Sequence, residues 1–237
     1  MKPNLLKSIF SKLGFELSDT QVTQFLTYES LLVEWNKHMN LTGITDSEGI
    51  YDKHFADSLT CLLSDKIKDG DKVIDVGTGA GFPGMPLKIF KPSLEITLLD
   101  SLNKRINFLK AVADETGLDK IDFIHGRAED FGQDLAYREQ YDIVVSRAVA
   151  ELPILLEFCS PFLKVGGYFI AQKGKKCEEE IKLAENALKV LNLEVAEIKS
   201  VETSVETKDH NLVIIRKVAS TDMKYPRRAG KPVKKPL

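Results

Sequence analysis

The stretch that decides the fold is Val73-Ile-Asp-Val-Gly-Thr-Gly-Ala-Gly-Phe-Pro-Gly84. An apolar run enters a loop containing Gly77, Gly79 and Gly81, and Pro83 follows as a residue suited to a first helical turn. Glycine tolerates a sharp turn and lets a ligand approach the main chain closely, because it has no side chain. The stretch therefore predicts a ligand-binding loop at the carboxyl end of a buried strand.

Outward from this loop, short apolar runs alternate with amphipathic segments, which predicts a parallel sheet with helices on both faces. The last two apolar runs, Leu193–Val201 and Asn211–Lys217, leave no room for a crossover helix, so they must pair antiparallel. The fold class is α/β, with a mostly parallel seven-stranded sheet and a terminal antiparallel hairpin. The other expected strands are Lys72–Val76, Leu94–Asp100, Ile121–His125, Asp142–Ser146 and Tyr168–Gln172.

The first 65 residues have a different, helical pattern. Ser18 and Gln21 form a capping-box signature, and apolar residues then recur at three- and four-residue spacing from Val22 to Met39. A second helix fits His54–Leu63. We expect an N-terminal helical extension over 1–65, a cofactor-binding core over 66–217 and a basic tail containing proline over 218–237.

The charge is distributed unevenly along the chain. The whole chain has 33 basic and 35 acidic residues, yet eight of the basic residues and only one acidic residue, Asp222, lie between Arg216 and the C-terminus. This asymmetry favours a polyanionic partner, although a solvated tail that aids solubility is the alternative. Three widely spaced cysteines without a CxxC pair, and no apolar membrane span, predict a cytoplasmic protein without disulfides or a metal site.

Two enzyme classes fit the glycine loop. Gly79-x-Gly81-x-x-Gly84 matches a dinucleotide fingerprint, which would make the protein a nicotinamide-dependent oxidoreductase. The alternative is the D-x-G-x-G-x-G loop of S-adenosylmethionine-dependent methyltransferases. Asp75 within the strand, the direct run into Gly77 and the terminal hairpin favour the methyltransferase, and hence a Rossmann-like class I methyltransferase fold. Asp100 ends the next strand, where a carboxylate can accept both hydroxyls of a ribose.

Two later strand ends are expected at the same edge of the sheet. One carries Ala128 and Glu129, placed to meet the adenine, and the other carries Arg147. The second lacks the Asn/Asp-Pro-Pro-aromatic motif of amine methyltransferases, and none of the cysteines follows a proline, as carbon-5 cytosine enzymes require. A ring nitrogen such as guanine N7 remains, and its free lone pair needs alignment more than acid–base chemistry. No catalytic residue is identified on these grounds.

The whole chain resembles the RsmG (GidB) family of bacterial small-subunit rRNA guanine-N7 methyltransferases. The glycine loop alone indicates the superfamily, while the stretches around Trp35 and Asp100 and the stretch from Ser146 to Ala150 are specific to the family. The matching stretches are Trp35–Thr42, His54–Leu59, Asp75–Gly84, Leu99–Arg105, Arg127–Glu129, Ser146–Ala150 and Lys224–Pro232.

This resemblance implies that S-adenosyl-L-methionine is the cofactor and that the substrate is a guanine of 16S rRNA, guanine 527, in the small subunit or an assembly intermediate. We also expect a monomer. Together with the loop and ribose arguments, it gives the candidate cofactor-binding residues Gly77, Gly79, Phe82, Asp100, Ala128, Glu129 and Arg147.

Basic residues near the predicted site are candidate RNA contacts, because most protein contacts to nucleic acid go to phosphate. Lys104 and Arg105 could join them, although an exposed helix face is the simpler explanation there. The candidates are Arg147, Lys173 and Lys175 near the strand ends and Arg227 and Arg228 in the tail. A ribosome-assembly factor that only senses the cofactor is the alternative function.

Overall fold

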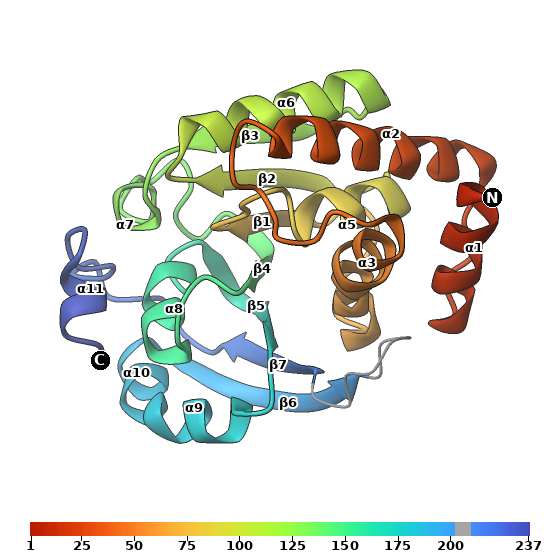
Figure 1. Cartoon of the computed structure of the whole chain (residues 1–237). Helices are drawn as coiled ribbons and strands as arrows, with labels where there is room; N and C mark the ends of the chain where they lie inside the picture. Colours follow the sequence, from red (N-terminus) through yellow and green to blue (C-terminus); the bar gives the residue numbers. More distant parts are fainter. Residues whose placement is uncertain (202–209) are drawn as a thin grey trace.

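The computed structural model describes residues 1–201 and 210–237, and its centre is a seven-stranded sheet of order β3-β2-β1-β4-β5-β7-β6 (Figure 1). Strands β1 to β5 run parallel, whereas β7 pairs antiparallel with both β5 and β6. This confirms the α/β fold with a terminal hairpin. The strands are β1 (Lys72–Val76), β2 (Glu95–Asp100), β3 (Ile121–His125), β4 (Tyr141–Arg147), β5 (Leu163–Lys173), β6 (Leu193–Val201) and β7 (His210–Lys217).

The direction of strand succession reverses at β1. Val73 pairs with Ile96 of β2 on one side and with Ile143 of β4 on the other. In open α/β sheets, ligands bind outside the carboxyl ends of the strands at such a switch point. The glycine loop follows β1 and therefore lies at this place.

Both faces of the sheet are buried, because successive residues of each strand point to opposite sides. Val73 and Val145 pack with the N-terminal helices, α5 (Gly84–Phe90) and α6 (Asn103–Thr116). Ile74 and Val144 pack on the other face with α8 (Leu152–Cys159) and its neighbours α9 (Cys177–Leu183) and α10 (Glu185–Val190). The near-continuous apolar strands of the sequence follow from this double burial.

The N-terminal helices are anchored on the sheet layer by side chains that cap and bridge. Ser18 and Gln21 form the expected capping box at the start of α2 (Asp19–Asn36). Gln21 also donates from Nε2 to the carbonyl oxygens of Ile89 and Phe90, at the end of α5. The remaining N-terminal elements are α1 (Lys2–Lys12), α3 (Ser47–Ile50), the π-helical turn η1 (Tyr51–Ala56), α4 (Asp57–Leu59) and the 3₁₀ turn η2 (Thr60–Ser64).

Some boundaries differ from the sequence expectation. The segment His54–Leu63 is not one α-helix but the succession η1, α4 and η2. Strand β5 begins at Leu163 and not at the expected Tyr168, because Leu163 already pairs with Tyr141 of β4. The remaining helices are α7 (Ala128–Phe131) and, near the C-terminus, α11 (Lys231–Lys234), while the loop between β6 and β7 lies outside the described residues.

Candidate functional site

A cavity of about 530 Å³ lies at the carboxyl ends of β1, β2 and β3. Its wall contains four of the predicted cofactor residues, and residues of the C-terminal tail complete it. We call it the first cavity. Its lining residues are Val76, Gly77, Leu99, Asp100, Ser101, Leu102, Arg105, Gly126, Arg127, Ala128, Glu129, Ala148, Val149, Phe158, Gly230 and Val233.

Gly77 brings the main chain to the surface of the first cavity. Its φ is +73°, and its N–H donates to the carbonyl oxygen of Leu99 at 2.9 Å. A Cβ at this position would lie 2.6 Å from Cγ2 of Val149. Both the backbone conformation and the close approach therefore require glycine here.

Asp75 holds the two ends of the glycine loop together. Its Oδ2 accepts hydrogen bonds from the Thr78 hydroxyl at 2.7 Å and from the Gly84 N–H at 2.8 Å. Burial raises the pKa of Asp75 to about 6, although these hydrogen bonds oppose the shift. Asp75 is thus part of the scaffold of the loop, and it does not line the first cavity.

Asp100 is fixed at the end of β2 by its neighbours. Oδ1 accepts from the Leu102 N–H at 2.8 Å, and Oδ2 accepts from the Gly79 N–H at 2.9 Å and from Arg105 Nη1 at 3.2 Å. A carboxylate has about four acceptor positions, so capacity remains for a hydroxyl of a ligand. The Gly79 main chain thus orients the carboxylate, and Gly79 itself is outside the cavity lining.

A second cavity of about 630 Å³ adjoins the first, and the two share Ala148 and Val149 as lining residues. It lies between the end of β4, the π-helical turn η1 and the end of β5. Its other lining residues are Lys53, His54, Asp57, Arg147, Ala150, Glu151, Gln172, Lys173, Gly174, Glu180 and His210.

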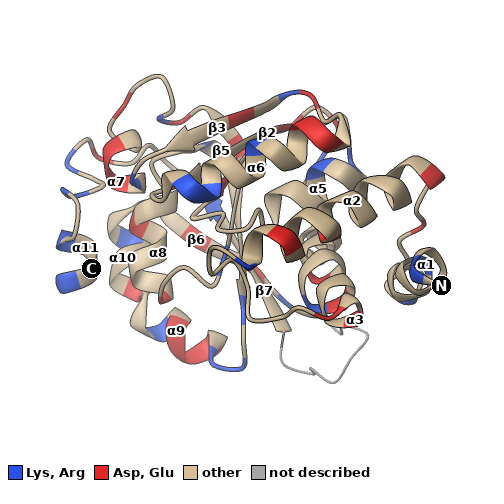
Figure 2. Cartoon of the chain, turned by 45° about the horizontal axis from the view of Figure 1, so that its top comes forward, with Lys and Arg blue, Asp and Glu red and all other residues tan. Residues whose placement is uncertain are grey.

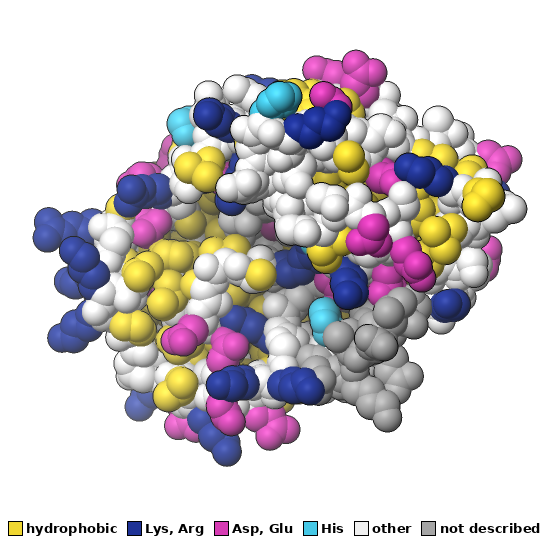
Figure 3. Space-filling view, viewed as in Figure 1, with side chains coloured by type: hydrophobic (Ala, Val, Ile, Leu, Met, Phe, Trp, Pro, Cys, Tyr) yellow, Lys and Arg dark blue, Asp and Glu magenta, His cyan; other side chains and the backbone are white. Residues whose placement is uncertain are grey.

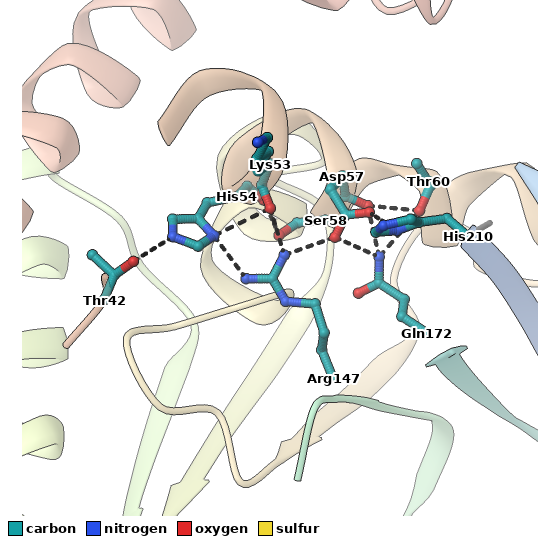
Figure 4. Close-up of polar contacts among 9 residues, drawn as sticks. All are labelled: Thr42, Lys53, His54, Asp57, Ser58, Thr60, Arg147, Gln172 and His210. Atoms are coloured by element: carbon teal, nitrogen blue, oxygen red, sulfur yellow. Dashed lines mark hydrogen bonds and ion pairs between the residues drawn. The ribbon is translucent and has the colours of Figure 1, made fainter. Parts of the chain in front are cut away.

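Arg147 is the centre of a polar cluster in the second cavity (Figure 4). Its Nη1 donates to Asp57 Oδ2 at 2.7 Å and to the Lys53 carbonyl oxygen at 3.1 Å, and its Nη2 lies 3.3 Å from Nδ1 of His54. Asp57 also pairs with Nδ1 of His210 at 2.9 Å. These contacts join the sheet to the N-terminal helices.

The electrostatics of the cluster favour one charge state for each group. Burial opposes ionisation of Asp57, but its contacts with His210 and Arg147 prevail and lower its pKa. Burial, assisted by the nearby Arg147 charge, lowers the pKa of His54 to about 4. Near neutral pH the cluster therefore holds a carboxylate, a guanidinium and an uncharged His54.

The Phe82 ring packs against two members of this cluster, His54 and Arg147. The His54 ring stacks on Phe82 with centroids 4.6 Å apart, and the Arg147 guanidinium lies 4.9 Å from the Phe82 centroid. Phe82 lines neither cavity. Its ring therefore holds two residues that line the second cavity.

The predicted cofactor residues are thus divided between two places. Gly77, Asp100, Ala128 and Glu129 line the first cavity together, whereas Arg147 lines the second. The tail residues Gly230 and Val233 were not predicted there. Gly230 lies within the family-matching stretch Lys224–Pro232, but nothing in that stretch indicated that it would lie beside the glycine loop.

The predicted RNA contacts also differ in their surroundings. Lys173 Nζ pairs with Glu180 Oε2 at 2.7 Å and donates to the Ala150 carbonyl oxygen at 2.8 Å, and its side chain is only 9% exposed. Arg227 pairs with the fully buried Glu157. Lys175 and Arg228, by contrast, are exposed.

Half of the basic residues from Arg216 onward are in ion pairs, two of them exposed and two with a buried partner. The pairs are Arg216 with Glu194, Lys217 with Glu139, Lys224 with Asp222 and Arg227 with Glu157. The exposed remainder is Arg228, Lys231, Lys234 and Lys235, which we call the tail cations. They form the blue cluster over α11 in Figures 2 and 3.

Within residues 1–201 and 210–237, no group of three or more His, Cys, Asp or Glu side chains could hold a metal ion. In the same part of the chain, no helix has the length and apolar character needed to cross a membrane. Cys61, Cys159 and Cys177 are all free thiols and all buried.

Known proteins match this chain over nearly its whole length. A protein called Ribosomal RNA small subunit methyltransferase G from Alkaliphilus oremlandii is 53% identical over 234 residues, covering 99% of this chain and 98% of the relative. Its counterpart from Alkaliphilus metalliredigens is 52% identical over 233 residues, covering 98% of each. A solved Haloferax volcanii complex of the Trm112 methyltransferase activator with a putative methyltransferase shares the fold, with 18% identity, a TM-score of 0.57 and coverage of 81% of this chain and 98% of that one.

The family model GidB, described as rRNA small subunit methyltransferase G, matches residues 21–221. This span includes most of α2, the glycine loop and every strand of the described sheet. The chain therefore belongs to the rRNA small subunit methyltransferase G family.

Proposed function

We propose that the protein transfers a methyl group from S-adenosyl-L-methionine to N7 of a guanine in 16S rRNA. The observation that carries this proposal is the shared wall of the two cavities at Ala148 and Val149. A methyl donor in one cavity and a base in the other would meet at this wall. Membership of the rRNA methyltransferase family supports the same assignment.

The first cavity fits the proposed cofactor. Gly77 admits close approach of a ligand to the main chain, and Asp100 holds a carboxylate where ribose hydroxyls can donate to it. Glu129 and Ala128 lie at the end of β3 beside the cavity, in position to contact an adenine ring. When bound, S-adenosyl-L-methionine supplies a methyl group on a positively charged sulfur.

The second cavity is the proposed place of the target guanine. Guanine N7 has a free lone pair and no proton, so the new N–C bond forms as the C–S bond breaks and the electron pair passes to sulfur. No general base is required. Asp57 is held by Arg147 and His210, which suits a positioning group better than a proton acceptor. Alignment of two bound reactants can lower a barrier by roughly 7–11 kcal/mol.

RNA phosphates are proposed to contact exposed cations around the two cavities. The tail cations Lys231 and Lys234 are next in sequence to Gly230 and Val233 of the first cavity, and Lys175 follows Gly174 of the second. Arg147 can face the target nucleotide from the cavity wall. We assign Lys173 and Arg227 to positioning, because internal ion pairs occupy both. We further propose a cytoplasmic monomer, in agreement with the three free buried thiols.

The experiment is methyl transfer from labelled S-adenosyl-L-methionine to small ribosomal subunits that lack the modification. The proposal expects label in 16S rRNA and none in large-subunit RNA. If the folded protein binds the small subunit but leaves its 16S rRNA unlabelled, the result supports the assembly-factor alternative instead. Calorimetry with NAD tests the oxidoreductase alternative, and we expect no binding.

A further inference from the structure

The C-terminal tail is folded onto the core, in contrast to the mobile basic arm that its composition suggests. Arg138 is buried, and its guanidinium donates to the carbonyl oxygens of Thr221, Asp222 and Tyr225, at distances from 2.7 to 3.2 Å. It also binds the Gly132 carbonyl oxygen at 2.8 Å. One cation from the core thus fixes the path of the first part of the tail.

A second attachment lies further along the tail. Arg227 Nε donates to Glu157 Oε1 at 2.8 Å and its Nη2 donates to Oε2 at 2.5 Å. Glu157 belongs to α8 and is fully buried, and the Arg227 main-chain N–H also donates to its Oε1 at 2.8 Å. Such a two-pronged pair fixes orientation as well as distance.

Beyond these attachments, the tail reaches the first cavity. The Gly230 N–H donates to Glu129 Oε1 at 3.1 Å, with Gly230 at a φ of +80°. Gly230 and Val233 both line the first cavity. Val233 is 58% exposed, so its apolar side chain is accessible to a ligand in the first cavity.

The tail residues line the first cavity but not the second. Ala148 and Val149 belong to both cavities, whereas Gly230 and Val233 belong to the first alone. In the proposed function, the methyl group must lie at the shared side. The adenine then lies away from it, beside Glu129 and the tail.

We propose that Gly230 and Val233 are part of the cofactor site and form the wall against which the adenine packs. This inference rests on the proposed function. The Gly230 N–H positions the Glu129 carboxylate, and Val233 offers apolar surface to the ring. The tail cations Lys231, Lys234 and Lys235 project from the same segment, so cofactor binding and RNA binding depend on different side chains of one element.

The test compares two changes by calorimetric titration with S-adenosylhomocysteine. A chain ending at Ala229 keeps the Arg138 contacts and the Arg227–Glu157 pair but lacks Gly230 and Val233. We expect its dissociation constant to rise at least tenfold. The matched control is the chain with Lys231→Ala, Lys234→Ala and Lys235→Ala, which keeps the wall, and its constant should stay within twofold of the unaltered chain.

A second pair of variants keeps the proposal testable if the shortened chain unfolds on a thermal melt. Val233→Asp places a carboxylate in the wall and should raise the dissociation constant at least fivefold. Val218→Asp changes a similarly exposed valine of the tail that is outside the lining and should leave the constant unchanged.

The outcomes distinguish a failure of the tail assignment from a failure of the proposed function. Equal affinity in the unaltered chain and in both wall variants would overturn the tail assignment and leave the proposed function intact. Failure of the unaltered chain to bind S-adenosylhomocysteine would overturn the cofactor assignment and the wall with it.

Discussion

Arg147 and Asp57 form an ion pair of 2.7 Å between the end of β4 and α4, and this pair joins the sheet to the N-terminal helices in the wall of the second cavity. The Asp57 side chain is 3% exposed and that of Arg147 is 16% exposed. Removal of either partner would leave the other charge with poor solvation. The pair therefore fixes the geometry at the boundary where the proposed reaction occurs.

The first prediction concerns Arg147→Lys. A lysine keeps the positive charge but has a single nitrogen, so it cannot contact Asp57, Lys53 and His54 together as the guanidinium does. We expect about 10- to 100-fold slower methyl transfer at saturating cofactor, in line with an effect of about 1.5–3 kcal/mol for bonds to charged groups. Single-turnover kinetics measure this rate.

The control for that change is Arg216→Lys, which alters an exposed ion pair between Arg216 of β7 and Glu194 of β6. Its transfer rate should equal that of the unaltered chain. An Arg147→Lys rate that also equals it would remove Arg147 from the site.

Asp100→Asn tests the proposed ribose contact. The amide keeps one acceptor oxygen for the loop but loses the carboxylate charge that faces Arg105 and a ligand hydroxyl. The amide cannot accept from both the Leu102 N–H and the Gly79 N–H, so the melting temperature should fall modestly while the chain still unfolds in one cooperative transition. We expect this folded variant to bind S-adenosylhomocysteine about tenfold more weakly. Asp122→Asn, an exposed change on the neighbouring β3, is the matched control. An unchanged dissociation constant would exclude Asp100 from cofactor binding.

Gly77→Ala, compared with Gly70→Ala, tests whether the close approach at Gly77 matters for cofactor binding in addition to its backbone conformation. An alanine in the left-handed region costs about 1–2 kcal/mol, and at this position its Cβ would also lie 2.6 Å from the Val149 side chain. Gly70→Ala has the same backbone cost, with a φ of +80° and open space around it. We expect only Gly77→Ala to weaken S-adenosylhomocysteine binding, by at least about tenfold. Equal effects of the two changes would contradict the close approach at Gly77.

The low pKa of His54 predicts a dependence of stability on pH. Between an ordinary value of 6.5 and its folded value of about 4, the unfolded chain takes up a proton that the folded chain does not. The free energy of unfolding should therefore fall as the pH falls through this window. In His54→Gln, the loss between pH 7.5 and pH 5 should be smaller by about 1–2 kcal/mol.

Denaturant unfolding at the two pH values measures this difference. His38→Gln changes an exposed histidine of the same N-terminal region and should keep the full loss. The assignment of the effect to His54 fails if His54→Gln loses as much stability as the unaltered chain.

The tail cations predict a salt-dependent share of RNA affinity. Each phosphate contact contributes roughly 0.7–0.9 to the slope of log K against log salt concentration. Replacement of Lys231, Lys234 and Lys235 by alanine should flatten the slope by about 2. Replacement of Lys224, which pairs with Asp222, should change it little. Equal slopes in both variants would make the tail charge irrelevant to RNA.

The glycine loop and the alternating apolar runs were sufficient to predict the sheet and its hairpin. Both signals are local, because strand burial and the turn at Gly77 act on neighbouring residues. Asp100, Ala128 and Glu129 could be placed for the same reason, since each follows a strand whose carboxyl end the topology fixes.

Contacts between distant segments could not be predicted in this way. The pairing of Arg147 with Asp57 depends on how the N-terminal helices pack, and η1 departs from the regular helix that periodicity suggests. The path of the tail depends on Arg138 and Glu157, two buried charges whose partners are mainly backbone or remote in sequence. A count of basic residues thus overestimates the charge available to RNA.

The central claim is methyl transfer to guanine N7, and nucleoside analysis tests it most directly. Small subunits lacking the modification are incubated with the protein and tritium-labelled S-adenosyl-L-methionine, and the 16S rRNA is digested to nucleosides. We predict that the label co-migrates with 7-methylguanosine and that no other nucleoside carries it. The account is contradicted if a different methylated nucleoside carries the label. It is also contradicted if the protein is folded and binds the cofactor but the 16S rRNA carries no label.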